Sequence, residues 1–409
     1  MQDRLTLYRN YMSQLDAAAN PFRAMERGLY VSHSREIARQ IATRVELQPS
    51  STHLIIGGIG SGKTTQLLAT LDRLTTLKDT AAVYVDVSKE HDLGKIRPGV
   101  LTALTGLELG KKLANAHTKE SKEALKEIER WAYGYSEWVE DDDYYEPPDN
   151  KPPDDSFEEE YVPQRLVQHP GLISPPRKPL STSIEKKLAA LSTMREALSA
   201  IYPHFVILLD SLDRLTNPKV FSDVIQQDVQ AISQCGIGVV LVGPLRMLYG
   251  EGRTFVDAFD HFYFHSAIDI EDDENGLTFL VQVLRARAPE QILPEGPAEK
   301  IAELSGGVLR DLISIARSAG EEAYLAGADR IEISHVLLAS EAFGRNLVLG
   351  IDRDGLKILQ QVHTKGKFVP TSDKEMSLLA TRRVLHYAPN RFRVHPTIVP
   401  LLRLQQEVQ

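Results

Sequence analysis

The 409-residue sequence contains a single cysteine, Cys235, which excludes an internal disulfide framework and any zinc site built from cysteines. It also lacks an apolar run long enough to cross a bilayer. The first residues, Met1-Gln2-Asp3-Arg4, are soon followed by more polar residues, unlike a signal peptide. We therefore expect a cytoplasmic protein with no membrane partner, and its length indicates two or three domains.

The net charge of −9 is unevenly distributed along the chain. Residues 140–160 hold eleven acidic residues and one basic residue, whereas residues 353–409 hold ten Lys/Arg and four Asp/Glu. The overall acidity therefore does not exclude nucleic-acid binding. The acidic stretch is either a solvated linker or an arm that competes with nucleic acid, or with an acidic partner, for the basic end of the chain.

One segment matches the P-loop pattern G-x-x-x-x-G-K-[ST] at every position: Gly57, Gly58, Ile59, Gly60, Ser61, Gly62, Lys63 and Thr64. The glycines allow a tight turn whose backbone N–H groups point at phosphates, Lys63 reaches the β and γ oxygens, and the Thr64 hydroxyl can ligate Mg²⁺. An apolar run precedes the loop, and a helical stretch from Thr65 follows it, so phosphate would meet a helix N-terminus. The segment predicts a site for ATP and Mg²⁺.

Short apolar runs alternate with helical stretches through the first 275 residues. The runs predict strands at 53–56, 81–85, 205–209, 237–242 and 262–264. Continuously apolar strands separated by helices are typical of a parallel sheet covered on both faces. With a P-loop after the first strand, we expect an α/β fold of the doubly wound P-loop NTPase type.

Composition divides the chain into three parts. We expect a P-loop ATPase core at 1–275, a helical lid subdomain at 276–350 and a winged-helix-like domain at 351–409. Within the core, an acidic, proline-rich insert occupies about 94–203; residues 113–131 read as helical and 139–180 as extended or mobile. A helix at 5–15 is expected to pack on the main domain, and Ser34 is expected to cap a helix at 34–45.

In the lid, the predicted helices are 277–287, 297–304, 308–326 and 334–343. In the last part, helices at 355–362 and 375–381 precede a hairpin formed by 384–387 and 391–394. Helices followed by a hairpin are typical of a winged helix.

The run Phe205 to Asp210 ends an apolar strand with an acid, which is the Walker B arrangement. This strand is expected to deliver Asp210 beside the P-loop, where the carboxylate holds magnesium through water. Ser211 follows Asp210, where many ATPases place a glutamate. Asp213 is the nearest alternative for polarising the attacking water, although it could equally be a capping or salt-bridging residue.

Three arginines are candidates for sensing the nucleotide. Arg246 follows the fourth predicted strand, and Arg253 precedes the fifth, where a finger that reaches a neighbouring subunit's nucleotide is often placed. Arg310 lies in the first turn of the helix that opens after Ser305-Gly306-Gly307, which aims it back toward the nucleotide. The alternative for all three is an ordinary solvated arginine.

The order of these motifs resembles AAA+ and STAND-type ATPases, and most closely their KAP-like and origin-recognition-like branches. The resemblance covers roughly 20–409 apart from the acidic insert. It implies that Lys63 and Thr64 bind phosphate and metal, that Asp210 is the Walker B acid and that Arg310 is the sensor-2 arginine. It also implies that Tyr30 and Val31 line the adenine pocket. The missing Asp-Glu pair and the absence of a polar sensor on the fourth strand favour a slow nucleotide-controlled switch.

Two functions follow from these features. The first is an oligomerising ATPase switch that regulates a partner protein or effector, as in prokaryotic antiviral defence or signalling. The alternative is a DNA-directed ATPase of the initiator or transposition-regulator type, supported by basic residues near the predicted hairpin: Lys365, Lys367, Arg382, Arg383, Arg391 and Arg393. A small-molecule kinase is disfavoured because no acceptor-substrate pocket is evident.

Overall fold

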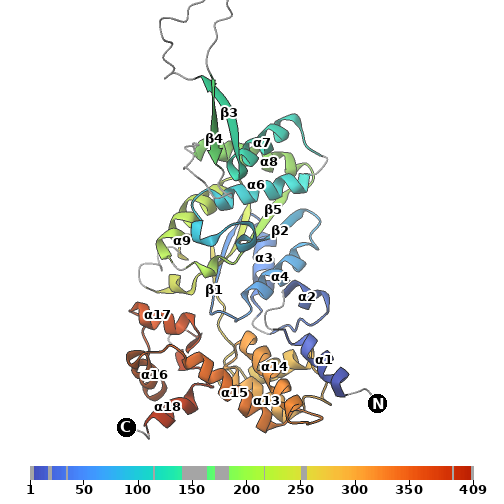
Figure 1. Cartoon of the computed structure of the whole chain (residues 1–409). Helices are drawn as coiled ribbons and strands as arrows, with labels where there is room; N and C mark the ends of the chain where they lie inside the picture. The colour runs from blue at the N-terminus through green and yellow to red at the C-terminus, as the bar shows by residue number, and fades with distance from the viewer. Residues whose placement is uncertain are drawn as a thin grey trace, which may run out of the picture.

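The computed structural model describes residues 4–16, 21–33, 36–113, 116–140, 164–170, 184–215, 217–249, 256–388 and 391–406. Figure 1 shows an elongated molecule in which a central sheet separates two helical regions. The helices between residues 100 and 199 stand at one end, and those from residue 276 onward lie at the other. Over the described parts of the chain, no helix combines the length and apolar character needed to span a membrane.

Five strands form the central sheet in the order β2-β5-β6-β1-β7, and every neighbouring pair is parallel. They are β1 (Thr52–Ile56), β2 (Thr80–Asp86), β5 (His204–Asp210), β6 (Gly238–Gly243) and β7 (His261–Phe264). All five strands predicted from the sequence are confirmed. In this order β5 lies beside β2, and their register sets Asp86 opposite Asp210 at the carboxyl edge.

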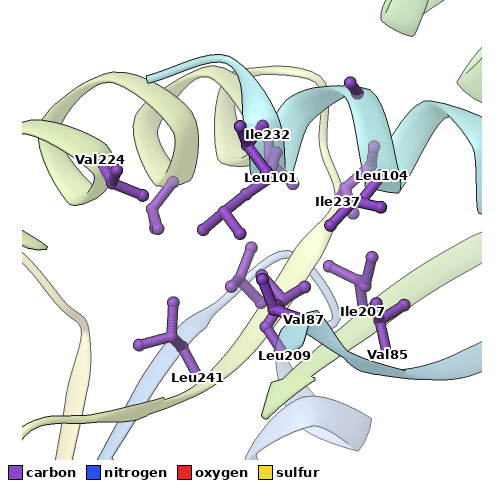
Figure 2. Close-up of a cluster of buried hydrophobic side chains, with 14 of the residues drawn as sticks. Val85, Val87, Leu101, Leu104, Ile207, Leu209, Val224, Ile232, Ile237 and Leu241 are labelled. Carbon is purple, nitrogen blue, oxygen red and sulfur yellow. The ribbon is translucent and has the colours of Figure 1, made fainter. Parts of the chain in front are cut away.

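Helices cover both faces of the sheet, as the continuously apolar strands predict. On one face lie α3 (Ile37–Leu47) and α4 (Lys63–Leu74); on the other lie α6 (Val100–Leu113), α8 (Ile184–Ser199), α9 (Pro218–Val224), a π-helical turn (Ile225–Val229) and α10 (Gln230–Gln234). Side chains alternate between the faces: Ile207 and Leu209 of β5 face α6 and α10 (Figure 2), and Leu208 faces α4. The fold is therefore the expected α/β P-loop NTPase class.

The long connection between β2 and β5 is more ordered than the sequence predicts. It contains α5 (Val87–Glu90), the 3₁₀ turn η1 (Leu93–Lys95), α6, α7 (Lys119–Tyr133), β3 (Gly134–Glu140), β4 (Gln164–Pro170) and α8. The expectation of an extended segment within 139–180 is confirmed for 164–170, but the sequence did not predict that β4 pairs there with β3 in an antiparallel hairpin. Residues 141–163, which hold most of the acidic stretch, lie outside the described residues.

The second helical region contains α12 (Gly276–Arg285), α13 (Glu295–Leu304), α14 (Leu309–Leu325) and α15 (Ile333–Val348), and it confirms the four helices predicted there. The N-terminal helix α1 (Arg4–Gln14) packs on this region and not on the sheet domain, which corrects the prediction. The Tyr11 hydroxyl donates to the Ala316 carbonyl oxygen at 2.6 Å. A Cβ on Gly320 would lie 2.4 Å from the Tyr11 ring, so this helix approach depends on the glycine.

The C-terminal unit has a hydrophobic core of its own, which includes Leu359, Leu379, Phe392 and Leu402. It comprises α16 (Arg353–Lys365), α17 (Asp373–Ala380), β8 (Val384–Ala388), β9 (Arg391–Val394) and α18 (Val399–Gln406). The predicted helices and hairpin are confirmed. The identification of this unit as a winged helix stays a prediction.

Candidate functional site

The P-loop connects the end of β1 to the start of α4. Gly60 and Gly62 have φ values of 82° and 102°, a backbone region that favours glycine. A Cβ on Gly57 would lie 2.0 Å from the His265 carbonyl oxygen, so this position also requires glycine. Helix α4 begins at Lys63, directly after the loop. The loop therefore presents the N-terminus of a helix, where free backbone N–H groups favour an anion.

Lys63 is buried, and three oxygen-bearing groups surround its ammonium. The ammonium donates to the carbonyl oxygens of Gly57 at 3.1 Å and Gly58 at 2.9 Å. It also pairs with the Asp213 carboxylate at 3.0 Å. Asp213 lies on the 3₁₀ turn η2 (Leu212–Arg214) just after β5, so the pair holds the loop and the turn together. An incoming phosphate would compete with Asp213 for the same ammonium group.

The carboxylate at the end of β5 lies between the P-loop helix and β2. Asp210 is 3% exposed and accepts hydrogen bonds from the Ser211 N–H at 2.7 Å and the Tyr84 hydroxyl at 2.8 Å. Burial raises the pKa of Asp210, and hydrogen bonds from Thr64, Ser211 and Tyr84 offset only part of this effect. Thr64 and Asp210, the two metal ligands predicted from the sequence, are thus in direct contact.

A third carboxylate, Asp86, ends β2 beside Asp210. It accepts hydrogen bonds from the Ser211 hydroxyl at 2.6 Å and the Ser88 hydroxyl at 2.7 Å. Burial alone would raise the pKa of Asp86, but these hydrogen bonds and the charge of Lys89 lower it. Ser211 has a φ of 72°, unusual for a residue other than glycine, and its contact with Asp86 helps to hold this turn.

A cavity of about 630 Å³ opens beside these groups, within the size range of small-molecule sites. Its lining includes the polar and P-loop residues Gly60, Gly62, Lys63, Thr64, Thr65, Asp210, Ser211 and Asp213 and the largely apolar residues Leu29, Tyr30, Val31, Phe279, Val283 and Ile313. A cavity that offers both phosphate-binding groups and apolar side chains has the two kinds of contact that a nucleotide requires.

Tyr30 and Val31, which the resemblance predicts to line the adenine pocket, both line this cavity. The Tyr30 hydroxyl donates to the Glu36 carboxylate at 2.6 Å, and Arg73 of α4 pairs with the same carboxylate at 3.1 Å. Burial and the neighbouring Glu36 raise the pKa of Tyr30. The N-terminal segment is therefore tied to the P-loop helix through Glu36.

Arg310 also lines the cavity, and it comes from the second helical region. Its backbone N–H donates to the Gly60 carbonyl oxygen at 3.2 Å, and a Cβ on Gly60 would lie 2.8 Å from the Arg310 Cβ. Desolvation lowers the pKa of Arg310. Within the described residues its guanidinium forms no ion pair, so its charge is available to the cavity.

The other two predicted arginines are not brought to the cavity. Arg246, on the 3₁₀ turn η4 (Leu245–Leu248), pairs with Asp373 of α17 in the C-terminal unit and does not line the cavity. This occurs because η4 follows β6 toward that unit and away from the P-loop. Arg253 lies outside the described residues.

Several residues at the site were missed by the sequence reasoning. Asp86 ends an apolar strand just as Asp210 does, so the same pattern could have identified it. Arg214 and Arg287 line the cavity, but neither belongs to a motif. His265 lies against the P-loop, where burial and the Lys63 charge lower its pKa to about 4. Only the pairing of β1 with β7, which sequence does not display, brings His265 there.

The donor groups of the site fit a magnesium nucleotide. The Ser61 hydroxyl is buried within the loop, and no residue that the structure describes forms a hydrogen bond with it, as expected for a group that serves a phosphate. The Thr64 hydroxyl and the Asp210 carboxylate are oxygen donors of the kind that Mg²⁺ prefers. Because Mg²⁺ is commonly held by one or two protein groups together with substrate phosphates, this small donor set suffices.

The chain was compared with known proteins in three ways. No protein-family model and no curated protein matches it. Solved structures similar to the chain include a Cdc6p from Pyrobaculum aerophilum, at 14% identity, with 96% of this chain and 98% of that chain covered and a TM-score of 0.46. The Aeropyrum pernix Orc1 protein in complex with DNA is another similar structure, at 15% identity. The match covers 93% of this chain and 84% of that chain, with a TM-score of 0.42.

A third similar structure is the Drosophila ORC bound to DNA, at 14% identity. The match covers 100% of this chain and 84% of that chain, with a TM-score of 0.43. At these values the similarities describe only a distant likeness of shape. The fold class of this chain rests on its own strand order and on the P-loop between β1 and α4.

Proposed function

We propose that the protein is an ATP-binding and slowly hydrolysing molecular switch of the AAA+ type. The observation that carries this proposal is the convergence of Lys63, Thr64, Asp210 and Arg310 on one cavity that apolar side chains also line. In the proposed arrangement, residues 1–275 bind the nucleotide, 276–350 form the lid that supplies Arg310 and 351–409 form a winged-helix-like output domain. Bound Mg²⁺ would neutralise phosphate charge; Lys63 and Arg310 would orient the phosphates from two sides.

Slow turnover follows from the groups at the carboxyl ends of β5 and β6. Ser211 stands where a glutamate could act as base, and Gly243, at the end of β6, has no side chain to contact the γ-phosphate. Asp213 is then the carboxylate best placed to orient water, once ATP draws Lys63 away from it. A switch that keeps ATP bound for long periods suits control of a partner protein, or assembly with further copies of itself.

The test of this proposal is ATP turnover by the wild-type protein and the Asp210→Asn variant. The variant keeps the shape of the side chain but weakens the metal site, so we expect ATP to bind while turnover falls about 100-fold, from about 3 kcal/mol of lost transition-state stabilisation. Turnover at the wild-type rate in this variant would remove Asp210 from the mechanism.

A DNA-directed ATPase is the second candidate, favoured by the arginines Arg391 and Arg393 on the C-terminal hairpin. ATP turnover measured with and without duplex DNA, over a series of salt concentrations, separates the candidates. Stimulation by DNA that weakens as salt rises supports the DNA-directed function. Turnover that is indifferent to DNA at every salt concentration supports a protein partner.

A further inference from the structure

The two hairpin arginines are occupied by acidic side chains from another part of the chain. The acidic linker, defined as residues 269–272, lies within the connection between β7 and α12. Arg391 pairs with Asp269 at 3.0 Å and contacts Asp272 directly. Arg393 contacts both carboxylate oxygens of Glu271, a two-pronged arrangement. The linker therefore neutralises most of the charge that the hairpin would offer to a partner.

This contact has the geometry of phosphate recognition. A guanidinium binds carboxylate and phosphate oxygens with the same fork of donors, so a carboxylate can stand in for a phosphate. Glu271 and Asp272 are each 60% exposed, whereas Arg391 and Arg393 are 26% and 34% exposed. Ion pairs this exposed contribute little to stability, so a competing anion could displace these two carboxylates.

Further basic residues surround the two arginines. A groove of about 500 Å³ in the C-terminal unit is lined by Val362, His363, Gly366, Arg391, Phe392, Arg393, Val394, Pro396 and Val399. Lys365 and Lys367 flank Gly366; both are exposed, and neither forms an ion pair with any residue that the structure describes. We call Lys365, Lys367, Arg391 and Arg393, together with this groove, the basic groove.

The other predicted basic residues have structural contacts. Arg382 donates to Asp311 at 2.9 Å, and Arg383 donates to the carbonyl oxygens of Leu347 and Leu349. Asp311 is 1% exposed, so its pair with Arg382 lies inside the protein. Of the six basic residues predicted near the hairpin, Lys365, Lys367, Arg391 and Arg393 thus belong to the basic groove, whereas Arg382 and Arg383 serve structural contacts.

We propose that the basic groove binds the phosphate backbone of duplex DNA and that Glu271 and Asp272 mask its two arginines in the free protein. This inference rests on the DNA-directed candidate function and adds the contact residues and their control. Duplex DNA is the favoured occupant because four basic side chains complement a polymer that carries many phosphates, and Lys365 and Lys367 form no ion pair with any described residue. The sequence proposed a similar role for residues 140–160, which lie almost entirely outside the described residues, and that role stays a prediction.

The test uses the full chain with the double variant Glu271→Gln/Asp272→Asn and a fluorescent DNA duplex of random sequence. Binding is followed by anisotropy over a salt series. Freeing Arg393, while Arg391 stays paired with Asp269, should tighten binding about 10-fold at low salt. It should steepen the dependence of log K on log salt by about 1, roughly 0.9 for the one further phosphate that an arginine neutralises. The matched control is Glu274→Gln/Glu290→Gln, which removes the same charge from two exposed residues outside the contact.

Two results would overturn the inference. One is a change in DNA affinity no larger than that of the control, which would make the linker contact purely structural. The other is a gain that persists when Arg391→Ala/Arg393→Ala is added to the first variant. Thermal unfolding of each variant reports folding, and ATP binding by each is measured separately. If ATP binding is unchanged and DNA affinity does not increase, only the masking of the arginines by the acidic linker is rejected. If the wild-type protein fails to bind ATP, the proposed ATPase function is rejected.

Discussion

Three carboxylates lie together at the carboxyl ends of β2 and β5, and their partners give them different roles. Asp210 is buried between Thr64 and Tyr84, Asp86 is held by serine hydroxyls, and Asp213 pairs with Lys63. Only Asp210 and Asp213 line the cavity. We therefore assign the metal to Asp210, water orientation to Asp213 and support of the Ser211 turn to Asp86.

These roles predict opposite effects of Asp213→Asn on binding and turnover. Removing its charge frees Lys63 for phosphate, so ATP should bind as tightly as in the wild type or more tightly. Turnover should fall about 100-fold, the lower range for a lost general base. Measurement of Kd by calorimetry and of kcat by phosphate release tests both.

The comparison variant is Asp86→Asn, which removes a neighbouring carboxylate that does not line the cavity. Its turnover should fall less than about 10-fold, because Asp86 supports the Ser211 turn and does not reach the nucleotide. Equal losses in the two variants, or weaker ATP binding by Asp213→Asn, would contradict the assignment.

At the scale of elements, strong hydrophobic patterns were predictable, and features created by tertiary contact were not. The five strands and the helices α12 to α15 follow from apolar periodicity alone. Helix α6 was missed because Gly106 and Gly110 lower helix propensity. Those glycines are needed instead for packing: a Cβ on Gly106 would lie 2.7 Å from Ile128 of α7. The hairpin β3–β4 was missed because no short turn joins its strands.

The π-helical turn after α9 shows another element that depends on distant contacts. It places Asp228 at the start of α6, where the carboxylate accepts from the Gly99 N–H at 2.5 Å, the Leu101 N–H at 2.9 Å and the Thr102 hydroxyl at 3.1 Å. These backbone donors have no partner within the helix. Asp228 thus caps α6 from a position more than a hundred residues away in sequence.

Asp228→Asn should lower the free energy of unfolding by about 2 kcal/mol at pH 7, because an amide nitrogen cannot accept a hydrogen bond. In the wild type, burial raises the pKa of Asp228 to about 6, although its hydrogen bonds and the charge of Lys187 lower it. The pKa of Asp228 is thus higher in the folded protein than the unfolded value of 3.8. The contribution of Asp228 to the free energy of unfolding is therefore complete below about pH 4 and is lost as the pH rises through about 6.

The free energy of unfolding of the wild type should therefore exceed that of Asp228→Asn by less at pH 7 than at pH 4. The difference should shrink by at most about 3 kcal/mol. Urea unfolding across this range measures it. Asp223→Asn in α9, a nearby carboxylate that accepts no hydrogen bond from the described residues, is the control. A gap between wild type and variant that widens with rising pH would contradict this account.

At the scale of the whole molecule, the nucleotide cavity and the C-terminal unit meet at the turn before α14. Arg310 contacts the P-loop, and the next residue, Asp311, pairs with Arg382 of the C-terminal unit. The Ile268 N–H donates to the Gly307 carbonyl oxygen at 3.0 Å, which fixes the acidic linker to the same turn. Contacts one or two residues apart therefore join the cavity to the C-terminal unit and to the acidic linker.

Sequence alone could not identify these long-range pairs. Counting charge along the chain identified the acidic stretch at 140–160 and the basic end, and it suggested that the two would meet. In the structure the acids that meet Arg391 and Arg393 are Asp269, Glu271 and Asp272, which belong to a second, shorter acidic run that the charge count did not single out. The P-loop differs because its chemistry is local: eight consecutive residues carry both the loop shape and the functional groups.

The most direct test of the central claim is calorimetric titration of the protein with ATP and Mg²⁺, comparing the wild type with Lys63→Ala. Losing one charge-assisted contact, worth about 1.5–3 kcal/mol, should weaken binding about 10- to 100-fold. The exposed Lys78→Ala serves as the control and should bind as the wild type does. A wild-type protein that does not bind ATP, or a Lys63→Ala variant that binds it with wild-type affinity, would contradict the assignment of this site.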